Sequence, residues 1–517
     1  MSKPVRYTKN YFNIYLWKGT GYFASFASLA IATPRLAANP SLFGIFTFCI
    51  SLNIFFQYAD LGFINAAQKY SSEYFARNDI ESEIKVTGFS SFILLAFIVP
   101  LFLSLLWLSY NPNMIIRDLA LNTAEWALAH KLLFTLAIFS PVLIIQRILQ
   151  IIFSVRLEDH YTQRVNICVS ILRVISVFYF FANGKYLIEE YFLFYNLLSL
   201  VSIFVIIKIA IRRYAYDFLK LLNNIRFSSE MYQKTSKLAI NSLFLALAWI
   251  VFYELDLVYI GFFLGKESVA YYALGFTILS FFRDLFGTFY YPFLVRFNHL
   301  VGEKNEQGLM SLYHTLLKIG LSIVILPVVC LQIFAEPIIV SWVGFKYEPS
   351  IKVVQLLLCS YFLSYITYPA SAMLTAKEEL KKLYITAAVL PVFFLTGVLL
   401  TQHKWGIVAY ALFKTLAILV NGTLLFFISL KQLEISARVF FSKYIKPFLL
   451  ALFSIVLVGN VIVKVLPLEK GFYALFVTVA AYVCVLFFGF FVYFLSDPII
   501  KEFGVATYYR LTKSTKI

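Results

Sequence analysis

Long apolar runs, separated by short polar connections, follow one another along almost the whole chain. The run 92–108 (FILLAFIVPLFLSLLWL) is apolar on every side, whereas a membrane β-strand alternates polar and apolar residues over about ten positions. A helix needs about 20 apolar residues to cross a bilayer core of about 30 Å. The pattern therefore predicts about fourteen membrane-spanning helices, at 14–36, 42–68, 86–109, 128–155, 163–183, 187–211, 238–263, 268–294, 312–341, 351–375, 382–401, 405–430, 446–466 and 472–495.

Composition supports this pattern. Hydrophobic residues make up 61% of the 517 positions, charged residues only 14%, and the mean hydropathy is +0.81. Soluble domains have about 45–50% apolar and about 25% charged residues, so we expect an all-α polytopic membrane protein. The polar, basic start is followed by an apolar run too long for a signal-peptide core, which indicates a retained first helix. The five cysteines are scattered through apolar segments, so we expect neither disulfides nor a metal site.

The basic residues predict an orientation. Of the 44 Lys and Arg, about 28 fall near alternate helix ends, about 10 on the opposite side and about 6 inside helices. The positive-inside rule then places the N- and C-termini on the cytoplasmic side of the membrane. The net charge of +17 is spread over many short loops, so it indicates membrane topology and anionic headgroups rather than nucleic acid.

The helix plan repeats. The first six and the next six predicted helices share short outer connections and charged inner loops, and 54–57 (IFFQ) aligns with 280–283 (SFFR). Two copies with an even number of crossings share one orientation and would enclose a central cavity. We therefore expect two six-helix lobes plus two additional C-terminal helices, with domains at 1–211, 212–237 (a basic linker), 238–430 and 431–517.

Basic residues inside the predicted helices are the main functional candidates. On insertion scales a Lys or Arg at a helix centre costs about 2.5–3.5 kcal/mol if it faces lipid. We expect such side chains to line water or pair with acids, and we predict that this set binds an anionic substrate: Lys18, Arg147, Arg173, Arg283, Lys318 and Lys414.

Two of these, Arg173 and Lys414, fall near the middle of their spans. The other four also have structural explanations. These are snorkelling for Lys18 and Lys318, headgroup contact for Arg147, and an ion pair with an acid on the preceding helix for Arg283.

Acids are fewer at membrane depth. A carboxylate in a low dielectric binds a proton more tightly, so we predict Glu254, Asp256, Asp284 and Asp60 as candidates for proton or sodium coupling. Ion pairing with Arg283 is the structural alternative for the deep acids. The first half has no acid near mid-membrane, so an anionic substrate would supply the missing negative charge.

Two stretches carry a resemblance to a known family. In 42–78 (LFGIFTFCISLNIFFQYADLGFINAAQKYSSEYFARN) a helix ends in an Asp-Leu-Gly turn and an amphipathic segment follows. In 249–276 (WIVFYELDLVYIGFFLGKESVAYYALGF) an acid precedes an apolar run, a Gly-Lys turn and a Tyr-rich helix start. With its helix plan, the chain resembles the O-antigen and polysaccharide flippases of the multidrug, oligosaccharidyl-lipid and polysaccharide (MOP) exporter superfamily.

The resemblance implies that the chain is a transporter rather than an enzyme. It would move an undecaprenyl-diphosphate-linked oligosaccharide, a unit of O-antigen, capsule or exopolysaccharide, from the cytoplasmic to the outer leaflet by alternating access. It implies membrane lipid, a polysaccharide polymerase and a chain-length regulator as partners, and no cofactor. No P-loop is present, because 261–267 (GFFLGKE) lacks the required spacing.

Three alternatives stay open. A multidrug or ion-coupled exporter of the same superfamily would need an acidic or apolar pocket, and fourteen helices are also typical of the lipid II flippase branch. A membrane glycan polymerase or ligase should have a large outer loop with catalytic residues, but the longest outer connections, 110–127 and 342–350, are short.

Overall fold

The computed structural model describes residues 7–57, 62–116, 121–156 and 158–497. All regular secondary structure in these ranges is helical. Eleven helical segments are long and apolar enough to cross a membrane. The prediction of an all-α, multi-pass membrane protein is confirmed.

The chain forms two compact units, Met1–Ala270 and Tyr271–Ile517. The first unit contains α1 (Tyr7–Leu36), α2 (Pro40–Ser51), α3 (Asn53–Gln57), α4 (Phe63–Ala76), α5 (Ile80–Tyr110), η1 (Pro112–Met114), α6 (Thr123–Val155), α7 (His160–Phe180), α8 (Ile188–Tyr214), α9 (Phe218–Asn223), α10 (Ser229–Trp249), η2 (Ile250–Glu254), α11 (Asp256–Phe263) and the first turn of α12 (Lys266–Gly302).

The second unit contains the rest of α12, followed by α13 (Glu306–Gly320), η3 (Leu321–Ile325), α14 (Leu326–Val343), η4 (Phe345–Tyr347), α15 (Glu348–Cys359), η5 (Ser360–Leu363), α16 (Ser364–Ala376), α17 (Leu380–Trp405), α18 (Ile407–Leu433), α19 (Ala437–Phe440), η6 (Phe441–Ile445), α20 (Lys446–Val463) and α21 (Phe472–Ser496).

Polar side chains fix where several spans begin. The Asn39 side chain accepts hydrogen bonds from the first backbone amides of α2, and Asp79 does the same for α5. At the start of α6, Asn122 and Glu125 form a reciprocal capping box. Such caps satisfy amides that have no partner within the helix, so the sequence sets these boundaries locally.

Glycines allow close packing in the first unit, where α1 packs along α7, and α6 contacts α2, α5 and α8. A Cβ atom added to Gly44 of α2 would lie 1.8 Å from the carbonyl oxygen of Lys266, and one added to Gly261 would lie 2.2 Å from the Phe48 ring. The backbones of α2, α11 and the start of α12 therefore approach as only glycine permits.

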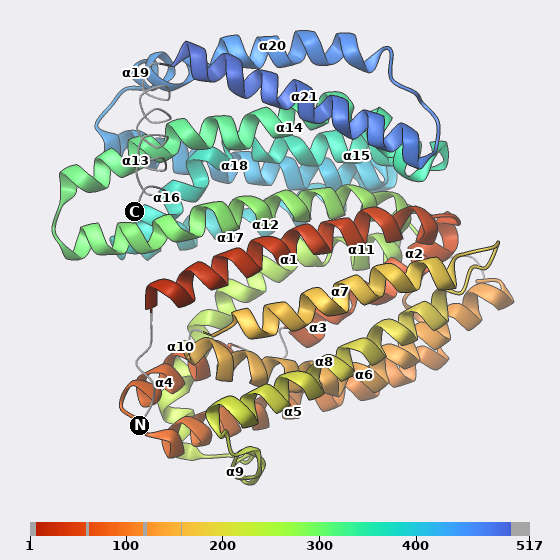
Figure 1. Ribbon diagram of the computed structural model, residues 1–517, viewed down its shortest axis with the longest axis vertical. Helices are drawn as coiled ribbons and strands as arrows, with labels where there is room; N and C mark the ends of the chain where they lie inside the picture. Colours follow the sequence, from red (N-terminus) through yellow and green to blue (C-terminus); the bar gives the residue numbers. More distant parts are fainter. Residues whose placement is uncertain (1–6, 58–61, 117–120, 157, 498–517) are drawn as a thin grey trace, which may run out of the picture. The chain divides into compact units, whose positions relative to one another are not determined.

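The two additional C-terminal helices pack on the second unit. Helices α20 and α21 pack against each other and against α14, and Figure 1 shows them in blue beside α14. The Tyr482 hydroxyl on α21 donates to the carbonyl of Pro327 on α14 at 3.3 Å. This carbonyl bond adds a specific polar contact to the packing of α21 on α14.

The predicted span 42–68 is not one continuous helix. It consists of α2, α3 and the start of α4, and Gly62 precedes α4 with a φ of 83°. This left-handed conformation suits glycine and ends a helical path. The predicted bounds 42–68 run past this break, although the Asp-Leu-Gly turn at 60–62 indicated a helix end there.

Helices α10 and α11 lie in the first compact unit, although the predicted lobes place residues 238–263 in the second half. The compact units describe which helices pack together. They do not test the predicted boundaries at 212–237 and 431, which remain predictions.

Three spans contain a π-helical turn: η2, η3 and η6. A π-turn inserts an extra residue into a helix and shifts the side chains that follow around its axis.

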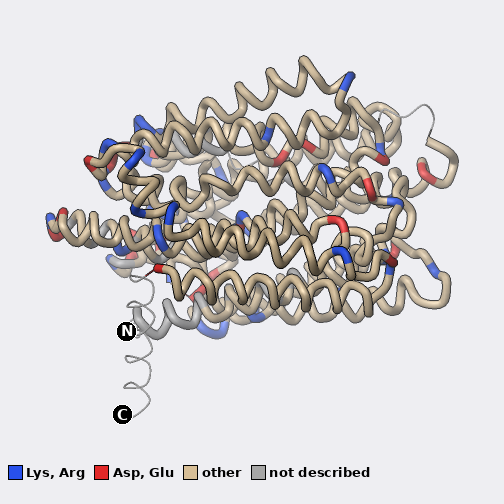
Figure 2. Tube along the Cα trace, turned by 90° about the horizontal axis from the view of Figure 1, so that it is seen from above, with Lys and Arg blue, Asp and Glu red and all other residues tan. Residues whose placement is uncertain are grey.

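Figure 2 shows Lys, Arg, Asp and Glu mainly toward helix ends, with a few along the helices between them. Of the predicted functional residues, Arg147, Arg173 and Lys414 lie within α6, α7 and α18.

Candidate functional site

Arg173 on α7 is a half-buried cation in the first unit. Its guanidinium carbon lies 3.4 Å from the centre of the Tyr195 ring, and its Nη2 donates to Ser199 Oγ at 3.1 Å. Tyr195 and Ser199 are four residues apart on α8, so they share a helix face. The α7–α8 contact therefore holds the guanidinium plane on an aromatic ring.

The positive charge of Arg173 lacks a carboxylate partner in the described ranges. Its Nε is buried and makes no hydrogen bond to any described group. Stacking on an aromatic ring stabilises a desolvated cation by about 2 kcal/mol, which is less than the cost of a central Arg in lipid. The arrangement leaves donor capacity for an anion.

Lys414 on α18 is a buried base in the second unit, and its side chain is 0% exposed. The Nζ atom lies 5.1 Å from the centre of the Phe276 ring and 5.5 Å from that of Phe394. Phe276 stacks with Tyr272, and Phe394 packs edge-on against Tyr410. Rings from α12 and α17 thus lie next to the ammonium group, and Tyr272 and Tyr410 pack against these rings.

Lys318 forms a buried ion pair that the sequence analysis did not predict. Its Nζ donates to both carboxylate oxygens of Asp497, at 2.8 and 3.1 Å, and the two side chains are 9% and 1% exposed. Asp497 directly follows α21, so the pair joins the last helix to α13. This contact neutralises Lys318 without a substrate.

Arg283 and Asp284 lie next to each other on α12. The Arg283 Nε lies 3.4 Å from Asp284 Oδ1, and the Asp284 side chain is 48% exposed. Adjacent helical residues do not share a face, so this contact is long and partly solvated. The Tyr368 hydroxyl also donates to the Arg283 backbone carbonyl at 3.2 Å.

The remaining candidates occupy different environments. Arg147 is half-buried on α6. Glu254 ends the π-turn η2, and Asp256, fully buried, begins α11 after the single residue Leu255. The π-turn therefore decides where both acids point. Lys18 lies on α1, but its side chain is outside the described residues, as is all of Asp60.

A buried ion pair near one end of the first unit was missed. Arg156 donates from both Nη atoms to the two carboxylate oxygens of Glu83, at 2.8 and 3.1 Å. The rings of Phe75, Tyr214 and Tyr216 lie 4.9–5.5 Å from the guanidinium carbon. The signal available in the sequence was a mixed-charge segment after the second span facing a basic residue after the fourth.

Glu158 forms a second charged cluster at the same end. It accepts hydrogen bonds from Arg213 Nε and Nη2 at 2.5 and 2.6 Å, and from the Tyr214 hydroxyl at 2.6 Å. Burial would raise the pKa of Glu158, but these donors outweigh it and lower the pKa below its ordinary value. The carboxylate therefore stays ionised and links α8 to the segment after α6.

At the opposite ends of these helices, Glu125 connects three elements. Its carboxylate accepts from Ser41 Oγ at 2.5 Å and from Lys266 Nζ at 2.8 Å, in addition to its role in capping α6. Together with the Gly44 contact, this cluster fixes the start of α12 on α2 and α6.

Solved structures have the same fold. The inward closed conformation of the lipid II flippase MurJ matches with a TM-score of 0.63 and 17% identity, over 92% of this chain and 98% of that chain. This chain has the MurJ and MATE transporter fold. An inward-facing multidrug resistance MATE family transporter of the MOP superfamily matches with a TM-score of 0.61 and 15% identity, over 80% and 94% of the two chains.

A further match is a MOP superfamily transporter from Pyrococcus furiosus, described as having a binding pocket of reverse polarity, with a TM-score of 0.56 and 13% identity over 82% of this chain and 96% of that chain. No protein-family model matches this chain, and no curated protein matches its sequence. The likeness to MurJ and MATE proteins therefore establishes the fold, and the activity has to be argued from the residues.

Proposed function

We propose that this chain is a MOP-superfamily flippase that moves an undecaprenyl-diphosphate-linked oligosaccharide from the cytoplasmic to the outer leaflet by alternating access. The observation that carries the proposal is the environment of Arg173. A guanidinium deep in a membrane helix, with only a hydroxyl and a ring as described partners, is stabilised when an anion approaches. Guanidinium groups bind phosphate oxygens in a bidentate manner.

Lys414 supports the proposal from the second unit. Its ammonium group is fully buried among aromatic rings and can supply a point charge to a diphosphate. Together with Arg147, these bases form the substrate-binding set that we now favour. We leave out Lys318 and Arg283, because each has a carboxylate partner. Lys318 pairs with Asp497, and Arg283 contacts Asp284.

The driving force follows from charge. An inside-negative potential favours outward movement of an anion by about 2.3 kcal/mol per charge per 100 mV. Coupling to protons or sodium through Glu254 and Asp256 would add to it, because Asp256 is fully buried beside a π-turn.

In this proposal the protein lies in the bacterial inner membrane with both termini in the cytoplasm and works beside a polysaccharide polymerase and a chain-length regulator.

Lipid II is the second candidate substrate. It is favoured by the match to MurJ, which covers almost all of both chains. Both substrates carry a polyprenyl diphosphate, so the same basic residues would serve either. A multidrug exporter is less well supported, because a half-buried guanidinium without a described carboxylate partner repels cationic drugs.

Reconstitution into vesicles with labelled undecaprenyl-diphosphate-linked oligosaccharide tests the proposal. We expect Arg173→Ala and Lys414→Met each to lower the translocation rate roughly tenfold or more, because a hydrogen bond to a charged group contributes about 1.5–3 kcal/mol. Arg173→Lys should lie between the wild type and Arg173→Ala. Lys131→Ala is the matched control, since Lys131 is 56% exposed and pairs with Glu189 at a helix end.

Equal translocation by the wild type and both charge-removing variants, at unchanged thermal stability, would refute the proposed role of these residues. Competition between labelled lipid II and the oligosaccharide lipid in the same vesicles would then rank the two substrates.

A further inference from the structure

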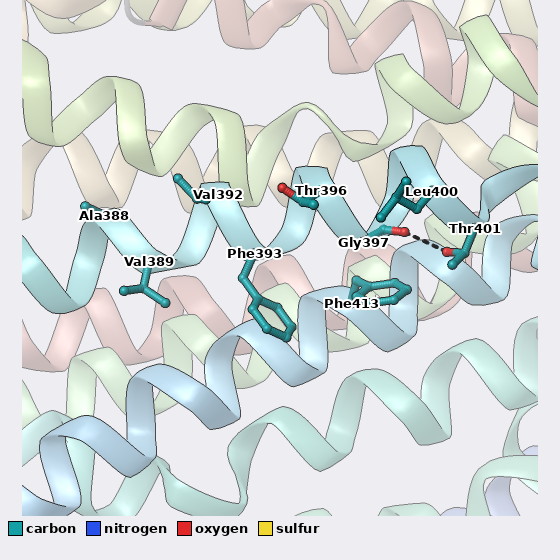
Figure 3. Close-up of a pocket in the computed structure, with 9 residues that line it drawn as sticks. All are labelled: Ala388, Val389, Val392, Phe393, Thr396, Gly397, Leu400, Thr401 and Phe413. Carbon is teal, nitrogen blue, oxygen red and sulfur yellow. Dashed lines mark hydrogen bonds between the residues drawn. The ribbon is translucent and has the colours of Figure 1, made fainter.

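A long apolar groove runs along the surface of the second unit between α17 and α18 (Figure 3). It encloses about 600 Å³, within the range of small-molecule sites. The residues that line it are Ala388, Val389, Val392, Phe393, Thr396, Gly397, Leu400 and Thr401 of α17 and Phe413 of α18.

Gly397 makes the groove possible. A Cβ atom at this position would lie 1.9 Å from the Phe413 ring, so the missing side chain lets the ring lie flat against α17 and form the floor. The Thr401 hydroxyl donates to the Gly397 carbonyl at 2.7 Å, as the dashed line in Figure 3 shows. The groove thus presents almost entirely hydrocarbon.

The lining residues of α17 form two rows with a spacing of four. One row is Ala388, Val392, Thr396 and Leu400, and the other is Val389, Phe393, Gly397 and Thr401. Since α-helices rise 1.5 Å per residue, the groove is about 18 Å long, over half of the hydrocarbon core. Val392 and Leu400 are 66% and 76% exposed, so the groove is open along its side.

Each row continues onto a residue suited to the membrane interface. The next position of the first row is Lys404, which is exposed, and that of the second is Trp405. Trp405 is 49% exposed, and its ring stacks with Phe413 at 6.4 Å. Trp anchors helix ends at the headgroup level, and a Lys there attracts a phosphate. The groove therefore leads from the hydrocarbon to a basic headgroup position.

We propose that this groove binds the isoprenoid chain of a polyprenyl phosphate lipid, with its phosphate at Lys404. The inference rests on the proposed function, because a flippase for polyprenyl-linked glycans has to accommodate the tail outside its polar pathway. Lys404 lies on the predicted outer side, so the site would hold the lipid at the outer leaflet. The apolar floor and the charge at one end match such a lipid, and a groove of about 18 Å would hold the part of the chain next to the phosphate.

Binding is tested on the purified full-length protein by native mass spectrometry with undecaprenyl phosphate as the probe. We expect Val392→Trp, which fills the groove, to lower the retained probe at least about tenfold, because losing the burial of two CH₂ groups suffices for that change. The matched control is Leu457→Trp on α20, a lipid-facing position that is 54% exposed. It should retain the probe as the wild type does.

A photo-crosslinking side chain placed at Val392 or at Leu457 provides a measurement that does not depend on a filled groove. The probe should label position 392 in preference to position 457. The wild type should also bind undecaprenyl phosphate better than uncharged polyprenol, and Lys404→Gln should remove this preference.

Three results would overturn the proposal: equal labelling at both positions, displacement of the probe by an equal amount of phosphatidylglycerol, or full retention by Val392→Trp. The first two would identify an ordinary lipid contact. Binding of the probe can be measured without translocation. A protein that translocates the lipid-linked oligosaccharide but does not bind undecaprenyl phosphate in the groove would refute only the groove proposal. A protein that binds the probe but does not translocate would refute only the proposed flippase function.

Discussion

Single residues set the response of the protein to acid at the loop ends of the first unit. Burial raises the pKa of Glu158, but hydrogen bonds from Arg213 and Tyr214 bring it below its ordinary value of 4.5. A carboxyl with a lowered pKa stabilises the folded state above that ordinary value, and its contribution is lost as the pH falls through the lowered pKa.

We therefore expect the thermal unfolding midpoint of the wild type to fall more steeply than that of Glu158→Gln as the pH drops below 4.5. Scanning fluorimetry of the detergent-purified proteins over a pH series measures this. Glu81→Gln is the control, because Glu81 is 73% exposed and pairs with the exposed Lys85 one helical turn away. Parallel curves for the wild type and Glu158→Gln would contradict the prediction.

At this scale the sequence locates residues but not their partners. Arg173 and Lys414 could be selected because a base in mid-membrane is rare. The Tyr195 ring beneath Arg173 could not be foreseen, since it depends on the register between α7 and α8. The same holds for Asp497, which lies far along the chain from Lys318.

Individual helices follow the hydropathy pattern closely, because each predicted apolar segment is mainly helical in the described residues. The departures have identifiable causes. In the described residues, the left-handed Gly62 interrupts the span 42–68, and π-turns occur in three spans. Apolar composition is the same in an α-turn and a π-turn, so hydropathy gives no information about the π-turns.

The close approach of α2 to the start of α12 gives a prediction for helix packing. Gly44→Ala should destabilise the protein by about 1–3 kcal/mol, because the new Cβ would lie 1.8 Å from the Lys266 carbonyl oxygen. Gly19→Ala on α1 is the control, with no atom within 4 Å of its added Cβ. It should be neutral or stabilising by up to about 1 kcal/mol. Denaturant unfolding of both variants measures the difference, and equal stabilities would show that α2 can shift.

For the molecule as a whole, hydropathy predicted the fold class, and the MurJ and MATE matches agree with it. Fourteen spans were predicted, and eleven helical segments of the described residues are long and apolar enough to be spans. The arrangement within the second unit could not be predicted, because lipid-facing and protein-facing residues are equally apolar in membrane helices. Helices α20 and α21 pack on α14 with the Tyr482–Pro327 hydrogen bond as a specific contact. Gly489 allows α21 to approach α20, because a Cβ atom there would lie 2.2 Å from Ile455.

The Lys318–Asp497 pair attaches the last helix to the second unit. Asp497→Ala leaves a buried ammonium without this partner and should destabilise the protein by about 3–5 kcal/mol. Lys318→Met combined with Asp497→Leu should recover most of the loss, because a well-packed apolar pair replaces a buried ion pair at little cost. Thermal unfolding measures the stability of each variant.

Translocation separates the two roles of Lys318. If the residue serves only to hold α21, the double variant should flip the lipid-linked oligosaccharide as well as the wild type. A stable double variant without translocation would return Lys318 to the substrate-binding set.

The doubly hydrogen-bonded contact between Glu83 and Arg156 has an evolutionary consequence. Both side chains are almost completely enclosed, and removing one member of such a pair strands the other charge. Lineages that share this architecture are therefore expected to keep both residues or to exchange both, while single replacements are eliminated. When many diverged sequences are aligned, columns 83 and 156 should covary strongly, even though 73 residues separate them along the chain.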